Sequence, residues 1–107
     1  MNFEITEAEQ IITLRLVGTA PAGSEGFRWA EGALSEFRRR LASGKLIKNC
    51  RLDFSRLVYR GGDFVGHFVI LPIHLGLDTR IVGSPEIEVA LNALLSGVSY
   101  RYRVVCA

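Results

Sequence analysis

A few residues in one apolar stretch have the types and spacing that catalysis or metal binding would need. Asp63 precedes His67 by four residues, so a helix would place a carboxylate and an imidazole on one face, where they could exchange protons. His67 and His74, the two histidines of the chain, would lie about 10 Å apart on that helix, too far apart to share one metal ion. Cys50 and Cys106 lack metal or redox spacing. We therefore expect no metal, no cofactor and two free thiols, and interpret His67 mainly as a packing residue.

Gly61 and Gly62 stand immediately before Asp63. Backbone N–H groups at a helix start can hold an anion, but the chain has no G-x-G-x-x-G motif and no Walker lysine, and Asp63 would repel phosphate. We interpret the glycines as a turn that needs positive φ, and Asp63 as the N-cap of a helix from Phe64 to about residue 75. Tyr59 and Arg60, with Phe64, could form an exposed aromatic and basic rim of the kind that dominates binding energy, and a place for Tyr59 in the core is the equal alternative.

The elements around this turn follow from hydrophobic periodicity. Ile12, Leu14 and Leu16 alternate with polar residues, as in a strand with one buried face. The same reasoning predicts strands at 3–7, 10–17, 50–54 (with an extension to 59 left open), 79–82 and 100–105. It predicts helices at 25–42, at 64–75 and from 85 to Gly97, with caps at Ser24, Gly44 and Ser84. The order ββαβαβαβ favours one α/β domain over residues 1–107, with an N-terminal hairpin, three helices and a mixed, mostly parallel sheet that is covered mainly on one face.

Composition limits the function classes. The 107 residues carry a net charge of +2, which is too small to indicate nucleic-acid binding by itself. No signal peptide and no apolar run long enough to span a membrane are present, so we expect a cytoplasmic protein. Arg38, Arg39 and Arg40, with Lys45, Lys48 and Arg51, are expected to form a basic cluster at the end of the first helix.

Three segments resemble the STAS domain of bacterial anti-sigma-factor antagonists. IITLRLVG (11–18) resembles the family's early strand, and RLDFSRLVYRGG (51–62) resembles the strand that leads into its second helix. DTRIVGSPEIEVAL (78–91) resembles the late strand and the helix that follows it. The resemblance implies a STAS-like fold and a bacterial signalling protein without catalytic activity.

One departure from the family pattern concerns its phosphorylated serine. Phosphorylation-regulated members carry Asp-Ser-Ser-Gly before the second helix, whereas this chain has Gly61-Gly62-Asp63-Phe64, with Gly62 at the position of the phosphoacceptor. No Ser or Thr occurs between Ser55 and Thr79. The resemblance therefore implies a binder that this serine does not switch, and Asp63 is a candidate for a permanent negative charge.

From these features we expect a protein–protein interaction module that is a monomer or weak homodimer and binds neither nucleic acid nor the membrane interior. The resemblance makes an anti-sigma factor or a related regulator the expected partner. The expected partner-binding residues are those of the glycine turn and its flanks, namely Tyr59, Arg60, Gly61, Gly62, Asp63, Phe64 and His67. A small-ligand or lipid-binding module of the same fold is the alternative, and an enzyme using Asp63, His67 and Asp53 is a third hypothesis.

Overall fold

The computed structural model describes residues 1–43, 46–96 and 102–106, and of residues 102–106 only the backbone strand. Five strands form one sheet in the order β1-β2-β3-β4-β5. The elements are β1 (Asn2–Ala8), β2 (Ile11–Thr19), α1 (Glu25–Leu41), β3 (Asn49–Val58), α2 (Phe64–His74), β4 (Asp78–Gly83), α3 (Pro85–Leu94) and β5 (Tyr102–Cys106). The predicted order ββαβαβαβ is confirmed.

The N-terminal hairpin forms one edge of the sheet. β1 pairs with β2 in antiparallel register, from Asn2 opposite Val17 to Ala8 opposite Ile11. The turn consists of Glu9 and Gln10, one residue later than expected, and both have positive φ, 52° and 67°. Two such residues give a turn whose twist matches that of the strands, although neither is a glycine.

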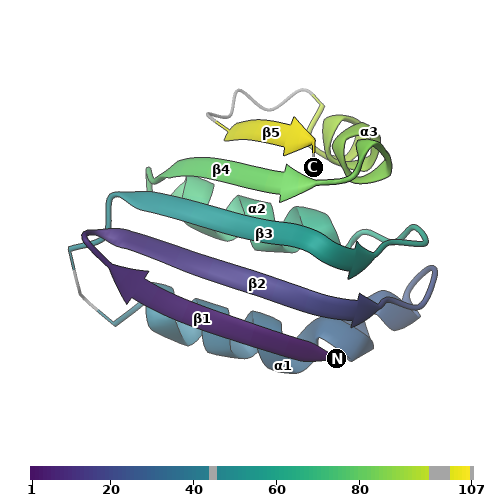
Figure 1. Ribbon diagram of the computed structural model, residues 1–107, viewed down its shortest axis with the longest axis horizontal. Coiled ribbons are helices and arrows are strands. Elements are labelled where there is room, and N and C mark those ends of the chain that lie inside the picture. Colours follow the sequence, from purple (N-terminus) through teal and green to yellow (C-terminus); the bar gives the residue numbers. More distant parts are fainter. Residues whose placement is uncertain (44–45, 97–101, 107) are drawn as a thin grey trace.

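The remaining strands run parallel to β2, and each pairs with the strand before it in the chain. When crossovers are all right-handed and the strand order is sequential, every connecting helix falls on the same face of the sheet. Figure 1 shows α1 and α2 behind the sheet and α3 beside β4 and β5. None of the described helices lies over the other face of the sheet, in agreement with a mixed sheet covered mainly on one face.

Alternate residues of the central strands fill the space between sheet and helices. Ile12, Leu14 and Leu16 of β2 are fully buried, as predicted from their alternation. Cys50, Leu52 and Phe54 of β3 and Ile81 of β4 continue this layer. In α1 the buried residues are Gly26, Ala30, Ala33 and Phe37, whereas the apolar side chains of Phe27, Leu34 and Leu41 are only partly buried. The small residues of α1 let this helix approach the sheet and α2 closely.

The N-terminal cap agrees with the prediction at α3 and differs from it at α1, and α3 ends at Leu94. Ser84 caps α3, because its Oγ accepts a hydrogen bond from the Ile87 N–H at 3.4 Å. Ser24 precedes α1 but has helical backbone angles and makes no side-chain cap bond. Pro72 lies in the last turn of α2, where backbone bonds from Leu75 to Pro72 and from Gly76 to Ile73 span three residues, as expected for a helix loosened by proline. The predicted roles of Gly44 and Gly97 as helix ends concern residues outside the described ranges.

The pairing of β2 with β3 shifts register at a bulge. Arg15 pairs with Asp53, but Val17 pairs with Arg56, so β3 carries one extra residue. Within the bulge, Asp53 Oδ1 accepts hydrogen bonds from the Ser55 N–H at 3.0 Å and from its Oγ at 2.6 Å. Asp53 Oδ2 accepts a bond from Arg15 Nε at 3.1 Å. Asp53 therefore forms its hydrogen bonds on the exposed face of the sheet.

The predicted basic cluster is divided between the two faces of the molecule. Arg39 and Arg40 bond to Glu36 on α1, and Arg40 Nη1 also lies 3.9 Å from Glu7 Oε2. Arg51 instead lies on the uncovered face of the sheet, because it alternates with the buried Cys50 and Leu52. Within the described ranges, no helix is both long and apolar enough to cross a membrane.

Candidate functional site

The chain reverses between β3 and α2 through residues 60–63, here called the glycine turn. Gly61 and Gly62 have φ of 95° and 123°, values that other residues rarely adopt, so the predicted need for glycine is confirmed. The Tyr59 hydroxyl donates a hydrogen bond of 2.7 Å to the Gly62 carbonyl oxygen. Burial, with a smaller contribution from the Asp63 carboxylate, raises the pKa of Tyr59, so this hydroxyl keeps its proton. This hydrogen bond, from the residue before the turn to a residue within it, restrains the conformation of the turn.

Phe64 lies beneath the glycine turn and not on the surface. Its side chain is fully buried, and its ring centre lies 6.0 Å from that of Trp29, 6.1 Å from Tyr59 and 6.5 Å from Phe68. The expectation that Phe64 forms part of an exposed rim is wrong. As the first residue of α2 it points toward α1, where it stabilises the position of the turn and has no surface to offer a partner.

Gly26 makes this packing of Phe64 feasible, and the sequence reasoning missed it. A Cβ on Gly26 would lie only 2.7 Å from Cδ1 of Phe64, so any side chain there would displace the ring. A glycine in the first turn of a predicted helix is the signal that was available, since glycine is costly within helices unless close packing requires it. Gly62 is similarly close to a neighbour, with its ideal Cβ 3.1 Å from the Gly23 carbonyl oxygen.

Asp63 is exposed at the start of α2 but does not cap the helix with its side chain. An N-cap residue needs extended backbone angles to turn its side chain back onto the helix, whereas Asp63 has φ −87° and ψ −5°. The prediction that the Asp63 side chain caps the helix is therefore wrong, although the helix begins at Phe64 as expected. The carboxylate stays available at the surface.

His67 lies one turn further along α2 and is also exposed. Its ring meets the ring of Phe27 edge to face, with centres 4.6 Å apart, which agrees with its interpretation as a packing residue. His67 and Asp63 both lie in the described part of the chain, and no hydrogen bond or ion pair joins them. Nor do the described residues contain a group of three or more His, Cys, Asp or Glu that could hold a metal ion.

A shallow hollow of about 210 Å³ lies between α2 and α3 and adjoins the glycine turn. We call it the α2–α3 hollow; its lining residues are Asp63, Gly66, His67, Ile70, Leu94 and Leu95. Gly66 helps to form the hollow because it has no side chain. A Cβ at this position would lie 3.4 Å from Leu94 Cδ1 and would occupy part of the space. Leu94 is 38% exposed, so the hollow combines an apolar rim with a carboxylate and an imidazole. Arg60, the first residue of the glycine turn, is exposed and does not line this hollow.

Comparisons with known proteins support the fold alone. No protein-family model matches the chain, and no curated protein matches it. Among solved structures, RsbS of Moorella thermoacetica, in a form with a serine-to-glutamate substitution, matches with a TM-score of 0.62 at 17% identity. The match covers 100% of this chain and 88% of that one. This chain has a STAS-like fold, as the sequence resemblance implied.

Proposed function

We propose that this chain, over residues 1–107, is a non-catalytic protein–protein interaction module with a regulatory role. The partner would bind at the glycine turn and the α2–α3 hollow, through Arg60, Asp63 and His67 together with Leu94. Tyr59, Gly61, Gly62 and Phe64 would act indirectly, by holding the turn in shape. The observation that carries the proposal is a rigid turn with an exposed carboxylate beside a partly exposed apolar hollow, on a STAS-like fold.

The geometry of the turn favours a partner that recognises a fixed surface. The hydrogen bond from Tyr59 to Gly62 and the buried Phe64 restrain the turn before binding, so binding costs little conformational entropy. Asp63 adds a constant negative charge at the start of α2, because its carboxylate is exposed and not used as a cap. Gly62, at the family's phosphoacceptor position, has no hydroxyl, so binding would not depend on phosphorylation there.

The sequence resemblance favours an anti-sigma factor or a related kinase-like regulator as the partner, in a bacterial cytoplasm. A small-ligand or lipid-binding role at the α2–α3 hollow is the alternative. Ligand pockets usually span about 300–1,000 Å³, whereas this hollow measures about 210 Å³ and is open. The apolar rim therefore fits the edge of a protein interface better than a lipid chain.

Affinity capture from the native cell extract tests this proposal. The test variant is Asp63→Arg with Leu94→Ser, both at exposed positions, so folding should be retained. The control is Glu9→Arg, an exposed acid in the β1–β2 turn, at the end of the sheet opposite the glycine turn. We expect one partner to be captured by the wild type and the control but not by the test variant, and the purified pair to lose affinity about tenfold or more.

Other results would contradict the proposal. Capture of the same partners by all three proteins would place the binding surface elsewhere. A small molecule that co-purifies with the wild type but not with the test variant, in the absence of any protein, would favour the alternative. A measurable activity lost in a folded His67→Ala variant would favour an enzyme.

A further inference from the structure

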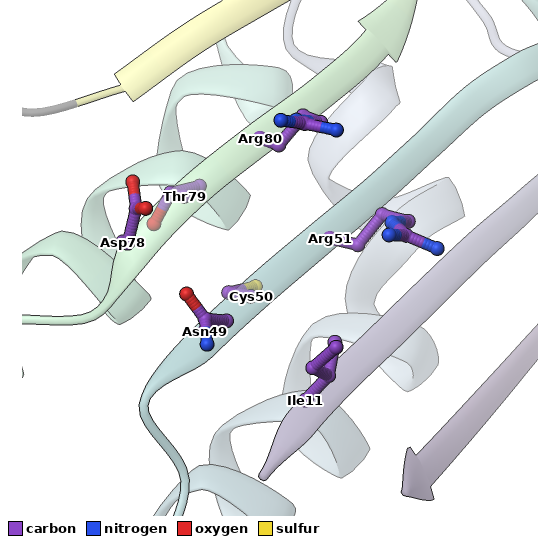
Figure 2. Close-up of a pocket in the computed structure, with 7 residues that line it drawn as sticks. All are labelled: Ile11, Asn49, Cys50, Arg51, Asp78, Thr79 and Arg80. Atoms are coloured by element: carbon purple, nitrogen blue, oxygen red, sulfur yellow. The ribbon is translucent and has the colours of Figure 1, made fainter. Parts of the chain in front are cut away.

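The uncovered face of the sheet carries two neighbouring arginines near the starts of β3 and β4. Arg51 and Arg80 are Cα partners in the parallel pairing of these strands, and both are exposed. Figure 2 shows their side chains on the same face, away from the helices. The backbone register continues the row, since Arg80 pairs in turn with Arg103 of β5. Basic residues therefore occupy matching positions on adjacent strands.

Neither arginine has an acidic partner within the described parts of the chain, where Arg15 provides the contrast. Arg15, on the same face, bonds to Asp53 at 3.1 Å. The oxygens of Asp53 are already occupied by Arg15 and Ser55. Like charges at neighbouring positions of a sheet repel each other, and strands lie only about 4.8 Å apart. A bound anion would remove this repulsion.

A hollow of about 290 Å³ opens beside the two arginines. Two residues back along the strands, Asn49 and Asp78 are also Cα partners and line its other end, with their side chains on the uncovered face (Figure 2). Two residues of a parallel strand span about 6.6 Å. The hollow thus has a cationic end and an end with an amide and a carboxylate, while Cys50 and Thr79 between them are buried on the helix side.

We propose that this hollow binds a small organic anion. Arg51 and Arg80 would hold its phosphate or carboxylate group, since paired guanidinium groups match planar or tetrahedral oxyanions. Asn49 and Asp78 would bind a hydrogen-bond donor, such as an ammonium or hydroxyl group, at the other end of the molecule. This site lies on the face of the sheet opposite the helices and is separate from the proposed partner surface.

The distribution of charge favours a small molecule over an extended polyanion. Asp78 lines the other end of the hollow and would repel a nucleic-acid backbone bound beside the two arginines. The net charge of +2 is also low for a nucleic-acid-binding domain. A compound with opposite charges about 6 Å apart would satisfy both ends.

Titration calorimetry and backbone amide spectra test the proposal, with inorganic phosphate, succinate and phosphoethanolamine as probes at constant ionic strength. We expect phosphoethanolamine to bind with a dissociation constant of about 1 mM or lower, to bind more tightly than phosphate, and to shift the amides of residues 49–51 and 78–80. Arg51→Gln and Arg80→Gln should each weaken binding about tenfold. Arg28→Gln, an exposed arginine on α1, should leave it unchanged. Asp78→Asn should abolish the preference for phosphoethanolamine over phosphate.

Several results would overturn the proposal. These are no amide shift with any probe, an equal loss of binding in the Arg28 variant, or shifts confined to other regions. Vesicles of phosphatidylethanolamine and phosphatidylglycerol separate a lipid headgroup from a free anion: binding to vesicles but not to soluble phosphoethanolamine would refute a small-molecule site. Circular dichroism of each variant would show that lost binding does not reflect unfolding.

Discussion

Placing a serine at Gly62 would introduce the residue type that the sequence resemblance expects at this position in phosphorylated STAS domains, and the structure predicts that this chain resists the change. Gly62 has a φ of 123°, at which a residue with a side chain is strained by about 1–3 kcal/mol. In addition, the new Cβ would lie 3.1 Å from the Gly23 carbonyl oxygen, a backbone atom that cannot move aside easily. We expect Gly62→Ser to reduce the free energy of unfolding by about 3 kcal/mol in total, out of roughly 5–15 kcal/mol for a typical domain.

Urea unfolding followed by far-ultraviolet circular dichroism measures this loss, and Gly61→Ser is the matched control. Gly61 has a φ of 95°, but no atom lies within 4 Å of its ideal Cβ. The control should therefore show only the backbone strain, about 1–2 kcal/mol. In thermal unfolding, a loss of about 3 kcal/mol corresponds to a midpoint lower by about 12–24 °C for a domain of this size.

The prediction is tested by comparing how much free energy of unfolding Gly62→Ser and Gly61→Ser each lose. If Gly62→Ser unfolds at the same urea concentration as the wild type, the strained backbone and the contact with Gly23 do not restrict this position. If Gly61→Ser costs as much as Gly62→Ser, the close contact contributes nothing. Either result would refute the argument that the conformation of the turn excludes the family's serine.

Three further predictions concern buried and titratable groups. Phe64→Ala should destabilise the fold by about 3–5 kcal/mol, measured by urea unfolding, because the ring is fully buried among other aromatic rings; a loss below about 1 kcal/mol would contradict its central position. Burial raises the pKa of the Cys50 thiol from 9.0 to about 12, so iodoacetamide at pH 8 should label Cys50 only in urea, as read by peptide mass spectrometry. Since the unfolded chain loses this proton first, stability should also fall between about pH 9 and 12, and less so in Cys50→Ala. Burial acts to raise the pKa of Asp53, but the bonds from Ser55 and Arg15 outweigh it and lower the pKa below its ordinary 3.8. The ionised Asp53 carboxylate therefore stabilises the fold above about pH 4, and this contribution is lost as the pH falls further. In an acid titration, the free energy of unfolding of Asp53→Asn should fall less steeply than that of the wild type.

Much of the fold could be predicted from local patterns in the sequence. The alternation of Ile12, Leu14 and Leu16 identified a strand with one buried face, and all three are buried. Ser84 followed by Pro85 marked the start of α3, where the serine bond is present. The need for positive φ at Gly61 and Gly62 could be predicted for the same reason, since it depends on the residues themselves and their neighbours.

The parts that could not be predicted depend on contacts between distant segments. Phe64 is buried because Gly26, 38 positions earlier, leaves room for its ring, and nothing in the local sequence around Phe64 shows this. Asp63 has the residue type of a cap, but the tight turn before it sets backbone angles at which the cap bond cannot form. The pairing of Arg51 with Arg80 likewise requires the register of two strands, which periodicity alone does not give.

The sequential order of the strands has a consequence for how this chain folds. Each strand pairs with the one that precedes it, so no strand has to be inserted between two others that formed earlier. The hairpin of β1 and β2 can form first, and each helix and its following strand can then be added at the open edge. We expect the sheet to grow in the direction of synthesis, with β5 last. A ribosome-bound chain that ends after β4 should therefore already protect the amides of β2 from hydrogen exchange.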